Sequence, residues 1–300
     1  MSLTFDVTDA LALGVPCLIA ASLFAPVDVA DATTIVVAVP GGTYTRAYWD
    51  LDVPGRAGYS FAEHLTARGF VVVALDNLGT GESSRPAHAD DITFDVAAAA
   101  NAAVVTQVAD RIRAGELAPV VPPRHDLRVV GVGHSLGGQL TAVQQATHRS
   151  YERVALLGSS FLGDDAKAAE ARLAAMAPDT WDDGYLDVPR SLLRPLFHAP
   201  DVPADVLAAD DAHATVLPRR LGVTALAPAR HQEQLAAIDV PVLLAFADVD
   251  TSSDPAAEVA CYPSSPNVTL IRLAGSAHCH NQSSARLKLW DCLARWLEAG

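Results

Sequence analysis

The stretch Gly133-His134-Ser135-Leu136-Gly137 follows an apolar run at residues 128–132 and precedes a helical pattern at residues 138–147. A strand, a tight turn and a helix in this order hold a serine side chain exposed at the end of a parallel sheet. Such a turn leaves no room for a Cβ two residues to either side of the serine, which accounts for Gly133 and Gly137. The pattern G-x-S-x-G is short enough to arise by chance. Support for Ser135 as a nucleophile therefore has to come from the rest of the chain.

Two later apolar runs each end close to a titratable side chain. Residues 241–247 form a continuous apolar run, typical of a strand covered on both faces, and Asp250 lies just beyond it. A second strand pattern at residues 268–273 leads to His278. Open α/β sheets place their functional residues at the carboxyl ends of strands. The chain order Ser135, Asp250, His278 is therefore typical of a nucleophile, an acid that orients the base, and the base itself.

With these three residues in place, the chain resembles the α/β-hydrolase superfamily over nearly its whole length. Pro40-Gly41-Gly42-Thr43 follows a strand pattern where that superfamily keeps a His-Gly segment, with proline here in place of the histidine. The stretch Asp76-Asn77-Leu78-Gly79-Thr80-Gly81-Glu82-Ser83 is similar to the superfamily's D-x-x-G-x-G-x-S turn. The resemblance, closest to a cap-bearing serine esterase or lactonase-like branch, implies a mostly parallel central sheet with helices on both faces and an inserted helical cap.

The spacing of the patterns predicts how the chain is divided. Strand and helix patterns alternate up to residue 160, as in a parallel sheet covered on both faces. About 80 residues then pass before the next core strand, and a connection that long needs structure of its own. We expect an α/β-hydrolase core in two parts, residues 1–160 and 239–300, and a helical cap at residues 161–238. Helical patterns in the cap lie at residues 164–176, 190–197 and 230–237.

Bulky side chains of the predicted cap are candidates to line a substrate pocket above Ser135. They are Trp181, Tyr185, Leu192, Leu193, Leu196 and Phe197, with Trp181, Tyr185, Leu193 and Phe197 as the main substrate-binding candidates. The alternative is that they pack the cap against the core. The last helical pattern, at residues 284–299, is expected to turn Leu287, Trp290, Leu293 and Trp296 inward as part of the core.

Backbone amides are expected to complete the site. Hydrolysis of an acyl compound builds negative charge on the carbonyl oxygen, and N–H groups that are fixed in advance stabilise this charge. The resemblance implies that these donors, the oxyanion hole, are the amides of Leu136 and Gly42, with Thr43 as a substitute.

Other residues could fill two of the three catalytic roles. His280 lies two residues beyond His278 and is the alternative base. Asp248 is the second choice for the acid, because the superfamily's usual G-x-x-D pattern is A-x-x-D here. Asp164 or Asp165, after the preceding strand, is a more distant alternative.

Composition excludes several classes of protein. The net charge of −14 argues against nucleic acid as a partner and favours neutral or cationic substrates. The chain lacks nucleotide-binding motifs and an H-E-x-x-H motif, so we expect no cofactor and no metal, although His278-Cys279-His280 invites a metal interpretation.

The same composition bears on location. No apolar run reaches the length of about 20 residues that a membrane span needs. The apolar stretch at residues 11–25 lacks the positive segment of a signal peptide, and residues 16–24 are interpreted as a strand. Four dispersed cysteines, Cys17, Cys261, Cys279 and Cys292, are typical of a reducing compartment. We therefore expect a cytoplasmic protein.

The expected activity is hydrolysis of a carboxylic ester or lactone of a hydrophobic small molecule through an acyl-enzyme. A serine at position 135 argues against the dehalogenases and epoxide hydrolases of this superfamily, which use aspartate there. An aminopeptidase or amidase would want an acidic pair for the substrate amine, such as Asp182-Asp183 or Asp210-Asp211. A C–C bond hydrolase and a non-catalytic ligand-binding homologue remain alternatives, and a homo-oligomer is possible.

Overall fold

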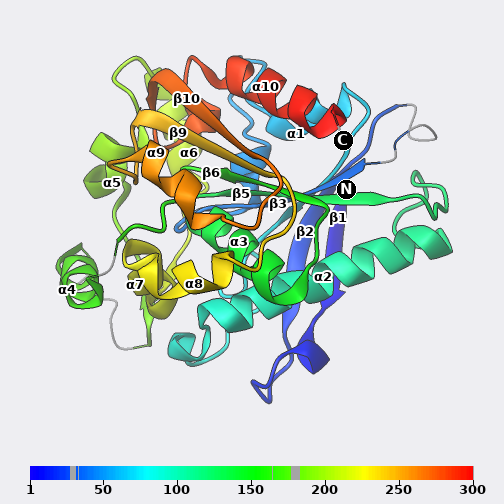
Figure 1. Cartoon of the computed structure of the whole chain (residues 1–300), viewed down its shortest axis with the longest axis horizontal. Coiled ribbons are helices and arrows are strands. Elements are labelled where there is room, and N and C mark those ends of the chain that lie inside the picture. The colour runs from blue at the N-terminus through cyan, green and yellow to red at the C-terminus, as the bar shows by residue number, and fades with distance from the viewer. Residues whose placement is uncertain (28–31, 33, 164, 177–182, 300) are drawn as a thin grey trace.

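An eight-stranded sheet forms the centre of the computed structural model, which describes residues 1–27, 32, 34–163, 165–176 and 183–299. Its order is β1-β2-β4-β3-β5-β6-β9-β10 (Figure 1). The six strands β4, β3, β5, β6, β9 and β10 pair in parallel, and β2 is antiparallel to both of its neighbours. The predicted mostly parallel sheet is therefore confirmed. The strands are β1 (Ser2–Asp6), β2 (Leu18–Phe24), β3 (Thr34–Val39), β4 (Val71–Leu75), β5 (Arg128–His134), β6 (Arg153–Leu157), β9 (Val242–Val249) and β10 (Val268–Ala277).

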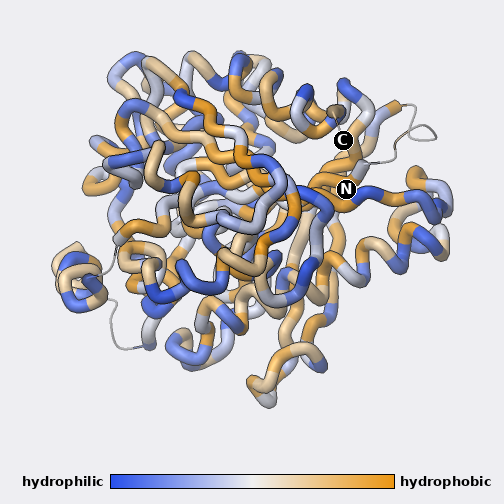
Figure 2. The backbone as a smooth tube through the Cα atoms, in the orientation of Figure 1, coloured by the Kyte–Doolittle hydropathy of each residue, from blue (hydrophilic) through white to orange (hydrophobic). Residues whose placement is uncertain are grey.

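Helices cover both faces of this sheet. Successive side chains of a strand point to opposite faces, and in this sheet the side chains on each face are apolar, so each face needs a cover. On β3, Ile35, Val37 and Val39 pack with α2 and α3, whereas Val36 and Ala38 pack with α1 and α10. Figure 2 shows hydrophobic residues concentrated along the central strands. Both faces are therefore dry, as in a doubly covered parallel sheet. These helices are α1 (Phe61–Thr66), α2 (Phe94–Ala114), α3 (Leu136–His148) and α10 (Arg286–Glu298).

The long connection between β6 and β9 is largely helical. Two of its three predicted helical patterns correspond to α4 and α5, and the third forms a short 3-10 helix (Pro228–His231) followed by α8. The sequence patterns missed α6, α7 and the two-stranded antiparallel sheet of β7 and β8. The elements are α4 (Ala166–Met176), β7 (Tyr185–Leu186), α5 (Arg190–Phe197), α6 (Ala204–Asp211), β8 (Leu217–Pro218), α7 (Arg219–Leu226) and α8 (Gln232–Leu235).

The last helix departs from its prediction at one position. Leu289, Trp290, Leu293 and Leu297 of α10 are buried, but the side chain of Leu287 is 46% exposed. At the helical repeat, Leu287 falls outside the face that these four residues form. The expectation that Leu287 packs inward is therefore wrong.

Candidate active site

The turn between β5 and α3 places Ser135 in a strained backbone conformation, with φ 54° and ψ −125°. Crowding on both sides explains the two glycines. A Cβ on Gly133 would lie 2.4 Å from the carbonyl oxygen of Gly137, and one on Gly137 would lie 2.3 Å from the carbonyl oxygens of Val39 and Pro40. Positive φ in a non-glycine residue persists only where its surroundings enforce it, and such residues cluster at functional sites.

His278 and Asp250 lie together at the ends of two neighbouring strands. The Nδ1 atom of His278 is 2.6 Å from the Oδ1 atom of Asp250. The backbone amides of Thr251 and Ala247 each donate a 2.8 Å hydrogen bond to the same carboxylate, whose side chain is 1% exposed. The backbone on both sides of Asp250 therefore surrounds the carboxylate of Asp250. With Nδ1 held by Asp250, the Nε2 atom of His278 remains for chemistry.

His280 contacts the other oxygen of this carboxylate. Its Nε2 atom lies 3.0 Å from the Oδ2 atom of Asp250, and the ring is completely buried. His278 lines a pocket together with Ser135, whereas His280 is not among the described residues that line it. His280 therefore contacts Asp250 away from the pocket, while His278 borders the same pocket as Ser135.

Local electrostatics keep the acid ionised and a third histidine neutral. Burial alone would raise the pKa of Asp250, but the charges and hydrogen bonds of His278 and His280 hold that pKa well below its ordinary value. Burial, with the neighbouring rings of His278 and His280, lowers the pKa of His134 well below its ordinary value. His134 is therefore neutral at pH 7 and donates its Nε2–H to the carbonyl oxygen of His278, at 2.8 Å.

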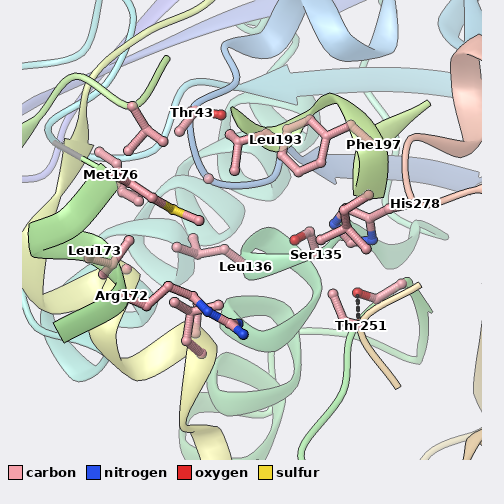
Figure 3. Close-up of a pocket in the computed structure, with 18 of the residues that line it drawn as sticks. Thr43, Ser135, Leu136, Arg172, Leu173, Met176, Leu193, Phe197, Thr251 and His278 are labelled. Carbon is pink, nitrogen blue, oxygen red and sulfur yellow. Dashed lines mark hydrogen bonds between the residues drawn. The ribbon is translucent and has the colours of Figure 1, made fainter. Parts of the chain in front are cut away.

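The pocket beside Ser135 has a volume of about 150 Å³ and mostly apolar walls. Figure 3 shows Ser135 and His278 next to each other at its edge. Gly42, Thr43 and Leu136 also line it, so the residues expected to donate oxyanion hydrogen bonds border the same space as the serine. Leu136 is the first residue of α3, where a helix leaves its backbone amides without an intrahelical acceptor.

The predicted substrate-binding residues have different places. Leu193, Leu196 and Phe197 line the pocket. Tyr185 is buried elsewhere, with its hydroxyl donating a 2.8 Å hydrogen bond to the carbonyl oxygen of Pro86. Trp181 lies outside the described residues, as do Asp164 and Asp182. Lining residues that the sequence analysis did not single out come mostly from α4, α7 and nearby loops: Gln139, Gly158, Arg172, Leu173, Met176, Val188, Leu217, Gly222, Ala225, Leu226 and Thr251.

The alternative acids are engaged elsewhere. Asp248 is exposed and accepts a 2.8 Å hydrogen bond from the amide of Gly275. Asp165 caps the first turn of α4, where it accepts from the amide of Ala168 at 2.9 Å. Neither carboxylate is hydrogen-bonded to His278.

The two acidic pairs considered for an amine are likewise occupied where they are described. Asp210 is buried and accepts a 2.8 Å hydrogen bond from the hydroxyl of Tyr44, and Asp211 pairs with Arg194. Asp183 accepts a 2.9 Å hydrogen bond from the amide of Tyr185. Neither pair offers two free carboxylates.

The insertion between β6 and β9 is hydrogen-bonded directly to the loop that follows β10 and carries His278, called here the histidine loop. The amides of His278 and Cys279 donate to the carbonyl oxygens of Leu196 and Phe197, at 3.1 and 2.8 Å. These two hydrogen bonds join the end of α5 to the end of β10. They therefore fix the position of His278 relative to the pocket wall that α5 forms.

Within the part of the chain that is described, no group of three or more His, Cys, Asp or Glu side chains could hold a metal ion. Over the same residues, no helix is long and apolar enough to span a membrane.

The sequence profile of the Alpha/beta hydrolase family matches residues 36–288. The chain belongs to this family. The match includes most of the sheet and the three residues Ser135, Asp250 and His278, so the resemblance to the superfamily is confirmed, and the match supports a hydrolase.

Several solved structures share the fold at low sequence identity. An esterase from Thermogutta terrifontis, described as malate bound, has a TM-score of 0.72 at 15% identity and covers 100% of this chain and 98% of its own. A bromoperoxidase from Bacillus anthracis has a TM-score of 0.67 at 18% identity, with 99% and 100% covered. A proline iminopeptidase from Mycobacterium smegmatis has a TM-score of 0.62 at 16% identity, with 100% and 98% covered. No curated protein sequence matches the chain.

Proposed function

We propose that this hydrolase cleaves carboxylic esters or lactones of hydrophobic small molecules through an acyl-enzyme formed on Ser135. The observation that carries the proposal is the 2.6 Å contact between His278 and Asp250, with His278 and Ser135 bordering one pocket. A serine hydroxyl is a weak nucleophile at neutral pH and needs a base that is itself oriented by an acid. These three residues supply that arrangement.

In the proposed reaction, the Oγ atom of Ser135 attacks the substrate carbonyl while the Nε2 atom of His278 accepts the hydroxyl proton. The amides of Leu136 and Gly42, or Thr43, donate to the oxyanion that forms. The protonated His278 then gives its proton to the departing alkoxide, and the alcohol leaves. A water molecule, deprotonated by His278, attacks the acyl-serine. As this intermediate collapses, His278 returns the proton to the Oγ atom of Ser135, and the acid is released. Asp250 stabilises the imidazolium in both halves of the cycle.

The shape and lining of the pocket favour a hydrophobic acyl or alcohol group. Its walls come from Leu173, Met176, Leu193, Leu217 and Leu226, among others. Apolar walls with a few convergent polar groups are typical of small-molecule sites. The occupied carboxylates of Asp183, Asp210 and Asp211 favour an ester or lactone over a substrate with a free amine.

The test is release of p-nitrophenol from short and medium acyl esters, followed through the burst and the steady state. An acyl-enzyme predicts a burst with wild-type protein, and we expect Ser135→Ala and His278→Ala each to abolish it and to lower kcat at least about 10⁴-fold. Circular dichroism would check that both variants fold. Activity that survives in Ser135→Ala would rule out the proposed nucleophile, and an inactive wild type would count against ester hydrolysis.

A further inference from the structure

One cationic side chain borders the otherwise apolar pocket. Arg172 lies on α4 and lines the same pocket as Ser135 and His278. Figure 3 shows its guanidinium group directed into the space between Leu136 and Thr251. Arg172 also lines a second cavity, which shares Met176, Leu193, Leu196, Ala225, Leu226 and Thr251 with the first. The guanidinium thus lies where two adjoining cavities meet beside the serine.

Arg172 has no partner within the described part of the chain. No described residue accepts a hydrogen bond from it or forms an ion pair with it, although the chain has 35 acidic and only 21 basic residues. Arg272 is the other described arginine in this state. Both residues are exposed, but Arg272 lies on β10 and does not line the pocket. Among the described residues of this acidic chain, the arginine that borders Ser135 has therefore been left without an acidic partner.

An unpaired guanidinium at an apolar wall is suited to a carboxylate. Its planar N–H groups match the two carboxylate oxygens, and such charge-assisted hydrogen bonds are stronger than neutral ones. The apolar side chains around it exclude part of the water that would otherwise screen the pair. Apart from His278, Arg172 is the only titratable residue among those described that line the pocket. The second cavity is also lined by Asp250, but both oxygens of that carboxylate are already engaged by two partners each.

We propose that Arg172 binds a carboxylate group of the substrate, so that the preferred substrates are hydrophobic esters or lactones that also carry a free carboxylate. This inference rests on the proposed function, because it assigns the substrate class of the same site. It also limits the expectation from net charge: repulsion of anions by the whole chain does not extend to a pocket that contains its own cation.

Two matched pairs of esters test the proposal and locate the carboxylate. Monoethyl adipate and ethyl hexanoate differ in a carboxylate on the acyl side, and 4-acetoxybenzoate and 4-methylphenyl acetate differ in one on the alcohol side. For each pair, the ratio of kcat/KM for the anionic ester to that for the neutral ester is measured in wild type, Arg172→Gln and Arg272→Gln. Comparing ratios between proteins cancels the intrinsic reactivity of each ester.

We expect Arg172→Gln to lower the ratio about tenfold in one pair, as for loss of a partly exposed hydrogen bond to a charged group. The affected pair identifies the side of the ester that carries the carboxylate. Arg272→Gln changes the net charge by the same amount and should leave both ratios within about twofold of wild type. Ratios that fall equally in both variants would indicate only a long-range charge effect and would overturn the proposal.

A binding measurement separates this inference from the proposed reaction. Ser135→Ala protein is titrated by calorimetry with monoethyl adipate and 4-acetoxybenzoate, with and without the added Arg172→Gln change. Weaker binding in the double variant supports the carboxylate site even if the wild type hydrolyses no ester, which would count against the proposed function alone. Equal affinities, together with unchanged ratios, would overturn the carboxylate site and leave Ser135-dependent hydrolysis standing.

Discussion

At the scale of single residues, the carboxylate of Asp250 is the most constrained group in the site. It accepts hydrogen bonds from His278, His280, Thr251 and Ala247, two on each oxygen. All four partners donate, so an ionised carboxylate satisfies them and a side chain with a donor of its own cannot. The arrangement therefore requires the negative charge, and this requirement can be tested.

We predict that Asp250→Asn lowers kcat for ester hydrolysis about 10⁴-fold, as expected when the acid no longer holds the imidazole in its productive tautomer. The asparagine NH₂ group would face two of the four donors, so some loss of stability accompanies the change. Steady-state kinetics with p-nitrophenyl esters and a urea unfolding curve measure the two effects. A variant with kcat within tenfold of wild type would rule out Asp250 as the orienting acid.

His280 offers a sharper prediction, because it acts on the base only through Asp250. Its Nε2–H stabilises the carboxylate charge, and the other charged or titratable rings nearby are His134 and His278, with ring centres 5.8 and 6.5 Å away. In His280→Leu the carboxylate loses one donor and attracts the protonated His278 more strongly. We therefore expect the acid limb of the kcat/KM profile to move to higher pH, with a moderate fall in kcat.

The readout for His280 is the midpoint of that acid limb rather than the rate. A purely structural role would reduce the amount of folded enzyme without moving the midpoint. His280→Gln, whose amide can donate to Asp250, is the matched variant and should restore the wild-type midpoint at least in part. An unchanged midpoint in His280→Leu would show that His280 does not act on the base.

At the scale of elements, the close contact between α3 and β3 determines how the serine is presented. The Cα of Gly137 lies against the backbone of Val39 and Pro40 at the end of β3, where a Cβ would come within 2.3 Å of two carbonyl oxygens. Backbone atoms cannot move aside as a flexible side chain can. The helix has to shift away from the strand if any larger residue is introduced.

We predict that Gly137→Ala lowers the free energy of unfolding by at least about 3 kcal/mol, at the upper end of the cost of overpacking. Gly14→Ala is the control: Gly14 has φ 68°, but a Cβ added there would have nothing within 4 Å, so only the left-handed backbone costs about 1–2 kcal/mol. Urea unfolding of both variants measures the difference. Equal losses would contradict the role of the α3–β3 contact.

The elements also show what the sequence could predict. The apolar run at residues 128–132 and the strand pattern at residues 268–273 lie within β5 and β10, since short apolar runs between turn signals have few other interpretations. The positions of Asp250 and His278 at the ends of β9 and β10 followed from the rule for strand ends. The contact between His280 and Asp250 could not be foreseen, because it depends on how two loops pack against each other.

The insertion was less predictable for a related reason. Its short helices, such as α6 and α7, bury few residues each, and α6 shows almost no apolar periodicity. Tyr185 and Leu193 are both bulky residues of this segment, yet Leu193 lines the pocket and Tyr185 packs away from it. Which of two such side chains faces the serine is decided by tertiary packing, which the composition of the segment does not encode.

At the scale of the whole molecule, His134 links distant segments through a buried, neutral ring. It comes from the end of β5, stacks on Tyr48 with ring centres 4.3 Å apart, and donates to the carbonyl oxygen of His278 after β10. Its pKa is well below the ordinary value, chiefly because of burial. An unfolded chain frees the ring to take up a proton near its ordinary pKa of about 6.5.

This difference gives the stability of the fold a definite pH dependence. The unfolded state binds the proton and the folded state does not, so the contribution of His134 is complete above about pH 6.5 and is lost as the pH falls below it. We predict that acidification from pH 7.5 to 5.5 lowers the free energy of unfolding by about 1 kcal/mol through His134 alone.

In His134→Gln this part of the slope should disappear, although the variant is less stable at every pH. His148→Gln, which removes an exposed histidine, should retain the wild-type slope. If His134→Gln and wild type lose stability in parallel between these pH values, the folded protein must accommodate a proton on His134, and the ring cannot be the neutral donor that holds the histidine loop.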